Sequence, residues 1–211
     1  MKTPDCLFTA FSRPKPGSER EFDDWYESTH MSEVLAVPGL ESLQRFRLSP
    51  TQLDLGVEAC PHRQVALGGI SGSPADFAEQ LVLRSARGEV TQSEALDDAR
   101  GWFFRPVRGG GVSTFDVNDS QNLLLWFGDP DAFVRAVGQQ GLGRTESLEI
   151  TVRDLPDRFT SPPPDRRILA FRFGISPDSL VRALGPALPE LSGSCSAAWL
   201  FEPSTKLRHS T

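Results

Sequence analysis

The spacing of apolar and polar residues in the first half of the chain predicts four strands and two helices. Short apolar or alternating runs predict strands over residues 6–12, 40–48, 64–70 and 101–107. Apolar residues at helical spacing predict helices over residues 18–35 and 74–87. Ser18 followed by Glu21 has the pattern of a capping box, and Ser73 can cap the second helix.

The second half of the chain repeats this order of elements. Its apolar runs predict strands over residues 122–127, 144–152, 166–175 and 195–203. Helices are predicted over residues 129–140 and 176–185, the first with Pro130 near its first turn. Each half therefore reads strand–helix–strand–strand–helix–strand, which is the order of a ferredoxin-like unit.

Short matches between the halves indicate that the repeat is internal to the sequence. The triplet ESL at 41–43 recurs at 146–148, and GIS at 69–71 recurs at 174–176, with the same separation in both cases. WFFRP at 102–106 resembles WLFEP at 199–203. Three matches in the same order favour duplication over chance.

These patterns predict an α+β fold of two tandem ferredoxin-like βαββαβ units that form an intrachain, pseudo-dimeric α/β barrel. One unit leaves a face of its sheet uncovered, and a second unit in the same chain can cover it. We expect the first unit over residues 1–107, a glycine-rich linker over 108–120, and a degenerate second unit with a C-terminal tail over 121–211.

Composition and charge exclude several classes of function. A net charge of −6 and a pI of about 5.1 do not suit nucleic-acid binding. No apolar run is long enough to cross a membrane, and no secretory signal is evident, so we expect a cytoplasmic protein. The three scattered cysteines lack CxxC spacing, which argues against a zinc site or a disulfide framework. P-loop, Rossmann and GxSxG motifs are also missing.

The densest candidate chemistry lies in the first helix, within FDDWYESTHMSEVLAVPG. Tyr26 and His30 are four residues apart and share a helix face, so a phenol and an imidazole can act as an acid/base pair. The plainer alternative is a half-exposed histidine near the C-terminal turn of a helix. The matching segment of the second unit, DPDAFVRAVGQQ, has neither residue, so we expect the active pocket in the first unit.

Further residues are predicted to contact a substrate, each beside a structural alternative. The set is Phe22, Trp25, Arg45, His62, Phe77, Leu81, Trp102 and Phe104. Phe22 and Trp25 also suit core packing. Arg45 and Arg47 alternate along one strand, and either can face the pocket or pair with acids at a rim. His62 also suits a surface loop. No metal ligands are predicted.

The first helix and the turn after it carry a family resemblance. Trp25, Tyr26, His30, Pro38 and Gly39 follow in the order seen in the EthD-like branch of the dimeric α/β-barrel superfamily. The resemblance implies a ferredoxin-like barrel and a pocket between helices and sheet. It also implies a range of reactions, which includes cofactor-free oxygenases, cyclases, decarboxylases, isomerases and, more distantly, haem proteins.

The sequence thus predicts a cofactor-independent acid/base enzyme, a lyase, cyclase or isomerase acting on a small apolar or aromatic metabolite, with secondary metabolism as the expected setting. His30, assisted by Tyr26, would move a proton next to a carbonyl or phenol. Three alternatives stay open: a cofactor-free monooxygenase, a haem protein with His30 as axial ligand, and a non-catalytic ligand-binding module. The expected partner is a small molecule, not a nucleic acid or a membrane, and a homodimer is also left open.

Overall fold

The computed structural model describes residues 4–57, 59–106, 121–138, 144–150, 163–165, 167–206 and 208–210. The first half contains β1 (Cys6–Pro14), α1 (Glu19–Trp25), a π-helical turn (Tyr26–His30), α2 (Met31–Leu35), β2 (Leu40–Leu48), β3 (Gln64–Ile70), α3 (Pro74–Ala86) and β4 (Leu96–Pro106). Every predicted element of this half is present. The helix expected over 18–35 is one helix interrupted by the π turn, and β4 begins earlier than expected.

The second half has the same order. It contains β5 (Asn122–Gly128), α4 (Pro130–Gly138), β6 (Arg144–Ile150), β7 (Arg167–Phe173), α5 (Pro177–Leu184), a 3₁₀ turn (Gly185–Ala187), α6 (Leu188–Ser192) and β8 (Cys195–Pro203). A short strand, β9 (Arg208–His209), follows. The 3₁₀ turn, α6 and β9 were not predicted. The predicted linker at 108–120 lies outside the described residues, as do the predicted ends of two elements at 139–140 and 151–152.

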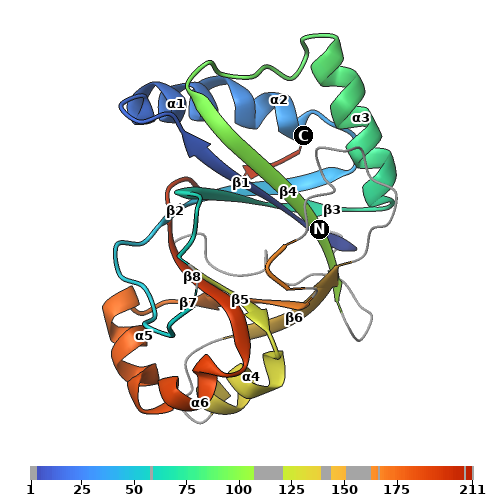
Figure 1. Ribbon diagram of the computed structural model, residues 1–211. Helices are drawn as coiled ribbons and strands as arrows, with labels where there is room; N and C mark the ends of the chain where they lie inside the picture. Colours follow the sequence, from blue (N-terminus) through green and yellow to red (C-terminus); the bar gives the residue numbers. More distant parts are fainter. Residues whose placement is uncertain are drawn as a thin grey trace.

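The strands form one closed antiparallel sheet. In the first half they are ordered β2-β3-β1-β4, and in the second half β6-β7-β5-β8, so both halves have the ferredoxin-like arrangement. β4 pairs with β6 and β2 pairs with β8, which joins the two sheets at both edges. The predicted α+β fold with an intrachain barrel is confirmed (Figure 1).

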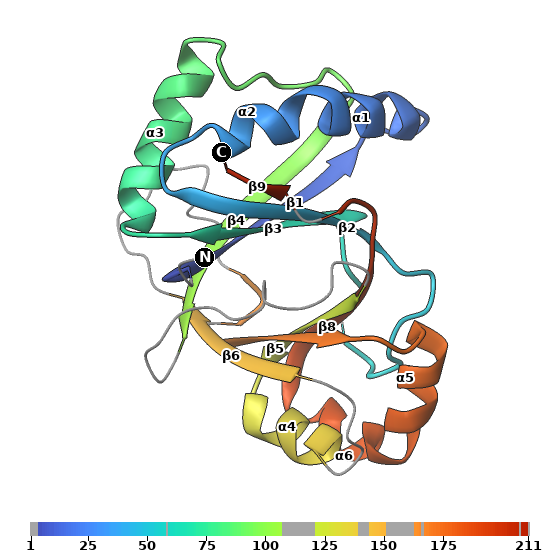
Figure 2. The ribbon, with the colours of Figure 1, turned by 180° about the vertical axis from the view of Figure 1, so that it is seen from behind.

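Side chains on the two faces of this sheet form separate hydrophobic layers. Alternate residues of each strand point into the barrel or towards the helices that cover it, so Phe11 faces inwards while Phe8 faces out. Both halves fill the interior. Phe11 contacts Trp102 at 5.0 Å and Trp199 at 5.6 Å between ring centroids. The interior is therefore a shared core, and the helices cover the sheet on opposite sides of the barrel (Figures 1 and 2).

Of the two predicted helix caps, Ser73 caps its helix and Ser18 does not. Ser73 has an extended backbone with ψ of 120°, and its hydroxyl accepts a hydrogen bond from the Asp76 backbone N–H at 3.3 Å. Ser18 precedes α1 with φ of −108° and ψ of 18°, and its side chain makes no capping bond. The capping box predicted for Ser18 and Glu21 is wrong, because capping needs an extended backbone, which Ser73 adopts and Ser18 does not. Gly39 takes φ of +95° after α2, a backbone conformation that glycine adopts readily.

The segment after β2 crosses from the first half of the chain to the second. Leu53 and Leu55 are buried among the side chains between the second sheet and its helices. Gln52 fixes the crossing, since its amide group both donates to the Leu200 carbonyl at 2.9 Å and accepts from the Leu200 N–H at 2.9 Å. This segment therefore does not cover a pocket of its own unit, but fills the layer of the other.

None of the helices within the described residues is both long enough and apolar enough to cross a bilayer.

The crossing segment generates a stability prediction. Leu55→Ala should lower the free energy of unfolding by about 2–3 kcal/mol, because it leaves a cavity in the second helix–sheet layer. Denaturant unfolding measures this effect. Leu83→Ala on α3 is the matched control, since Leu83 is 40% exposed and its loss should cost less than about 0.5 kcal/mol. Equal effects of the two substitutions would contradict the packing described.

Candidate functional site

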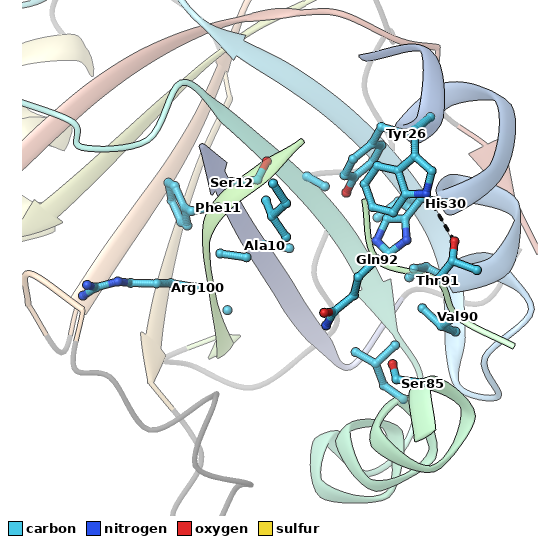
Figure 3. Close-up of a pocket in the computed structure, with 18 of the residues that line it drawn as sticks. Ala10, Phe11, Ser12, Tyr26, His30, Ser85, Val90, Thr91, Gln92 and Arg100 are labelled. Atoms are coloured by element: carbon cyan, nitrogen blue, oxygen red, sulfur yellow. Dashed lines mark hydrogen bonds between the residues drawn. The ribbon is translucent and has the colours of Figure 1, made fainter. Parts of the chain in front are cut away.

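A cavity of about 340 Å³ lies between the helices and the sheet of the first half of the chain. Its walls come from α1, the π turn and α2, from α3, from the segment that joins α3 to β4, and from the outer face of β1 and β4 (Figure 3). Most of the lining is apolar, with His30, Tyr26, Ser12, Ser85, Thr91, Gln92 and Arg100 as the polar contributors. An apolar cavity with few polar groups is typical of a small-molecule site.

The π turn brings His30 against two aromatic rings. The Met31 backbone N–H donates to the Tyr26 carbonyl, so this turn holds one residue more than an α-helical turn. Side chains five residues apart then come to lie on the same face, and the Trp25 ring stacks on His30 with centroids 4.3 Å apart and planes at 28°. Tyr26 meets His30 edge-on at 5.0 Å, as the predicted shared face requires. The imidazole therefore contacts the rings of Trp25 and Tyr26 and also lines the cavity.

Burial keeps His30 neutral. Its side chain is 19% exposed, and loss of hydration lowers its pKa from 6.5 to about 4. Glu33 and the Thr91 backbone oppose this fall in pKa, while the Arg45 cation adds to it. At neutral pH the imidazole therefore has a free lone pair and can accept a proton.

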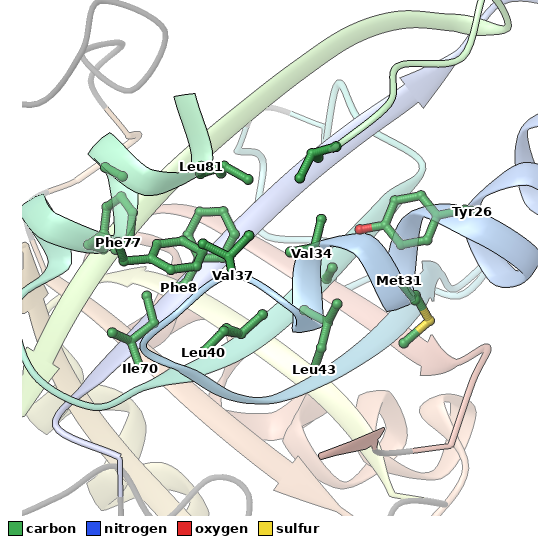
Figure 4. Close-up of a cluster of buried hydrophobic side chains, with 14 of the residues drawn as sticks. Phe8, Tyr26, Met31, Val34, Val37, Leu40, Leu43, Ile70, Phe77 and Leu81 are labelled. Carbon is green, nitrogen blue, oxygen red and sulfur yellow. The ribbon is translucent and has the colours of Figure 1, made fainter. Parts of the chain in front are cut away.

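Burial has the opposite consequence for Tyr26, the single tyrosine of the chain. Its pKa is raised to about 12 by desolvation, against a lowering effect from Arg45. The phenol is therefore protonated at neutral pH, and its hydroxyl projects from the helix into the first helix–sheet layer, towards Val34 (Figure 4). Tyr26 is placed to donate a hydrogen bond, whereas His30 is placed to take a proton.

Arg45 lies beneath Tyr26 and does not line the cavity. Its guanidinium carbon is 4.3 Å from the centre of the Tyr26 ring, and Nη2 contacts Asp23 Oδ1 at 2.5 Å. Asp23 also accepts from Arg47 at 3.2 Å and from Gln64 at 2.7 Å. The substrate contact expected for Arg45 is not made through the cavity wall, because Asp23 holds its guanidinium beneath the Tyr26 ring.

A polar network that the sequence did not predict adjoins His30. Glu33 Oε2 accepts from the Thr91 backbone N–H at 2.8 Å and from the Thr91 hydroxyl at 2.9 Å, and it lies 3.8 Å from His30 Nδ1. The Trp25 indole N–H donates to the Thr91 hydroxyl at 3.2 Å, drawn as the dashed line in Figure 3. Glu33 could have been predicted as a neighbour of His30, because residues three apart on a helix share a face. Thr91 comes from an irregular segment, and no sequence pattern indicates it.

The remaining predicted residues divide between the cavity and other layers. Phe22, Trp25 and Leu81 line the cavity, as expected. Phe77 packs beside it in the core, 5.4 Å from Phe8 between ring centroids. Trp102 and Phe104 face the barrel interior, because their parity on β4 is opposite to that of Phe103. Neither lines the cavity, so the substrate contact predicted for each is not made there.

His62 lies neither at the cavity nor on the surface. It is 2% exposed, packs against Phe11 at 5.9 Å, and its Nε2 lies 3.1 Å from Asp98 Oδ2. Burial lowers the pKa of His62, and Asp98 opposes the fall. His62 thus belongs to the end of the barrel core. No group of three potential ligands gathers to hold a metal ion anywhere in the part of the chain that the structure describes.

The equivalent layer of the second half is packed with large side chains. Trp126 and Phe133 contact at 5.0 Å, and Phe133 contacts Phe171 at 5.5 Å, each between ring centroids. Leu53 and Leu55 add to this layer from the first half. The cavity described above lies in the first unit, while the acid/base chemistry expected there stays a prediction.

Comparison with solved structures finds the same fold. A protein described as anthrone oxidase-like aligns with a TM-score of 0.53 and 12% identity over 97% of this chain and 92% of its own. A candidate monooxygenase from Lactobacillus acidophilus aligns over 99% of this chain and 97% of its own, with a TM-score of 0.46 and 11% identity. One from Fusobacterium nucleatum covers 100% and 97%, with a TM-score of 0.47 and 8% identity. No family profile and no curated protein matches the sequence.

The likeness to the first of these structures establishes the dimeric α/β-barrel fold for this chain. The EthD-like branch stays a prediction. The predicted lyase, cyclase or isomerase activity is wrong, because the structure that shares this fold with a TM-score of 0.53 is described as anthrone oxidase-like. The cofactor-free monooxygenase, which the sequence left open as an alternative, stays a prediction.

The single tyrosine allows a direct test of the site's electrostatics. Titration of the tyrosinate absorbance should give a midpoint near pH 12 in the folded protein, because burial disfavours the phenolate. The same titration in denaturant should give about 10. A native midpoint near 10 would contradict the buried position of Tyr26.

His30 also predicts a pH dependence of stability. Its folded pKa of about 4 lies below the ordinary 6.5, so the unfolded chain binds a proton that the folded protein rejects. The contribution of His30 to the free energy of unfolding is therefore complete above about pH 6.5. It falls by up to about 3 kcal/mol as the pH drops towards 4. Denaturant unfolding across this range should show a shallower slope for His30→Gln than for the unsubstituted protein. Identical slopes would show that His30 titrates normally.

Proposed function

We propose that this protein is a cofactor-independent oxygenase of small aromatic substrates that carry an acidic proton, either phenolic or next to a carbonyl. The observation that carries the proposal is a neutral, largely buried imidazole beside a protonated phenol at the wall of an apolar cavity. Such a pair can remove a proton from an apolar molecule and hold the anion that results.

His30 is the proposed general base. Its low pKa ensures that the imidazole is unprotonated at neutral pH, and the cavity places it next to a bound molecule. Proton transfer to a buried imidazole creates a cation in an apolar wall. The Glu33 carboxylate, 3.8 Å from Nδ1, stabilises that cation and makes the transfer less costly.

Tyr26 is the proposed donor to the substrate oxygen. Because its pKa is about 12, the phenol keeps its proton and can donate a hydrogen bond to an oxygen that gains negative charge. The Arg45 cation beneath the ring strengthens this donor, since it favours negative charge on the Tyr26 oxygen. Trp25 and Phe22 supply flat apolar walls for an aromatic ring.

The oxidation step follows from the chemistry of the anion. A phenolate or enolate is electron-rich and can give an electron to O₂, and combination of the two radicals forms a carbon–oxygen bond. For a methylene group next to a ring, the hydroperoxide then loses water and leaves a ketone. The balance is R₂CH₂ + O₂ → R₂CO + H₂O, so the substrate supplies all the electrons. The name of the oxidase-like neighbour refers to anthrone, a ketone with such a methylene group, and this supports the choice of substrate class.

The finer assignments belong to the same proposal. Membership of the EthD-like branch rests on the order of Trp25, Tyr26, His30, Pro38 and Gly39, and a cytoplasmic location rests on composition. We propose the monomer as the catalytic unit, because one chain closes its own barrel.

The test is oxygen consumption with anthrone as the substrate. His30→Gln should lower kcat by about 10²- to 10⁴-fold, since it removes the base. Tyr26→Phe should lower kcat by about 10²-fold, since it removes the donor to the oxyanion. His209→Gln, at an exposed position of β9, is the matched control and should retain full activity.

Two outcomes would redirect the proposal. Full activity of His30→Gln would remove the base assignment, and failure of the protein to consume oxygen with anthrones or phenols would remove the substrate class. Added haem that produces a Soret band dependent on His30 would favour the haem-protein alternative.

A further inference from the structure

We propose that Glu33 is a positioning residue that fixes the tautomer of His30, so that Nδ1 carries the proton and Nε2 presents its lone pair to the cavity. This assignment rests on the proposed role of His30 as a base, and it names the group that prepares the base. Glu33 is not one of the residues that carry the resemblance to the EthD-like branch.

The geometry of the polar network supports this role. His30 Nδ1 is buried without a hydrogen-bond partner, and a carboxylate oxygen, Glu33 Oε2, lies 3.8 Å away. That oxygen already accepts two hydrogen bonds from Thr91 and can only accept a third. A buried nitrogen that faces an acceptor is favoured as the protonated one, because a lone pair there would face another lone pair.

Thr91 holds the carboxylate in place from the other side. Its backbone N–H and hydroxyl bind the same Glu33 oxygen at 2.8 and 2.9 Å. The Trp25 indole in turn donates to the Thr91 hydroxyl, and the Trp25 ring stacks on His30. These contacts link Glu33 through Thr91 and Trp25 back to His30. The orientation of the imidazole and the position of the Glu33 carboxylate therefore depend on each other. Orientation of a histidine by a neighbouring carboxylate is a common means of fixing its tautomer.

The charged groups around His30 act in opposite directions. Glu33 on the same helix raises its pKa, as does the Thr91 backbone from the segment after α3, while Arg45 from β2 lowers it. Tyr26 faces the ring as a neutral phenol. Removal of the Glu33 charge leaves Arg45 as the remaining charged influence, and the imidazole should then become harder to protonate.

The first experiment reads the tautomer directly and does not need a substrate. Nitrogen-15 NMR of the imidazole distinguishes a protonated Nδ1 from a protonated Nε2, and the chain has three histidines, so His30→Gln assigns the signal. We expect protonated Nδ1 in the unsubstituted protein. Glu33→Ala should abolish this preference, and Glu33→Gln should lower the midpoint of the His30 titration. Glu79→Gln, on the exposed face of α3, should change neither.

The second experiment uses activity on anthrone. Glu33→Gln should lower kcat by roughly 10- to 100-fold with little change in KM, because the substrate still binds but the base is less well prepared. Thr91→Val should lower kcat in the same way, and Thr91→Ser should restore it, since serine keeps the hydroxyl that binds Glu33. A purely structural role would instead lower thermal stability and leave the tautomer unchanged.

The two proposals fail in different ways. Protonated Nε2 in the folded protein, unaffected by Glu33→Ala, would overturn the role of Glu33 even if the protein oxidises anthrones. Protonated Nδ1 that depends on Glu33, in a protein that consumes no oxygen, would leave this role intact and overturn the proposed function.

Discussion

Two edge pairings, β4 with β6 and β2 with β8, determine the organisation of the rest of the molecule. A single four-stranded ferredoxin-like sheet exposes two edges and one apolar face, and each is unfavourable in water. The pairings join the edges and enclose the uncovered faces in one step. Side chains from both halves then fill the interior, so that space is not available to a ligand. The cavity has to lie outside the barrel, between the sheet and the helices that cover it.

That constraint also explains why the two halves differ. Each half has its own helix–sheet layer, and either could hold a cavity. In the second half, aromatic side chains and the leucines of the segment after β2 occupy the layer. In the first half, part of the layer stays open beside His30. The fold therefore has large buried side chains in the helix–sheet layer of one half and a cavity in the layer of the other, which has room for a small molecule.

Much of the fold could be predicted because it depends on local patterns. Apolar periodicity placed all eight barrel strands and all the longer helices, and the repeat of the element order indicated the closed barrel. The pairing of Tyr26 with His30 was equally local, since residues four apart share a face of any helix. The short elements after α5 were missed, because three to five residues are too few to show a period.

The parts that failed depend on register and on tertiary contacts. The parity of β4 decides whether Trp102 or Phe103 faces the cavity, and a run of three aromatic residues gives no sign of parity. Thr91 reaches Glu33 only through the path of an irregular segment. Arg45 pairs with an acid 22 positions away in the sequence. The stacking of Trp25 on His30 was also unpredictable, because residues five apart lie on different faces of a regular α-helix.

The π turn makes the site depend on helical register as well as on residue identity. An α-helix advances about 100° per residue, so conversion of this turn to α-helical bonding would rotate one side of the helix relative to the other by about that angle. His30 would leave both the Trp25 ring and the cavity, although no side chain had been replaced. The backbone bonding of one helical turn, which includes the bond from Met31 to Tyr26, thus separates a helix that presents a base from one of the same sequence that does not.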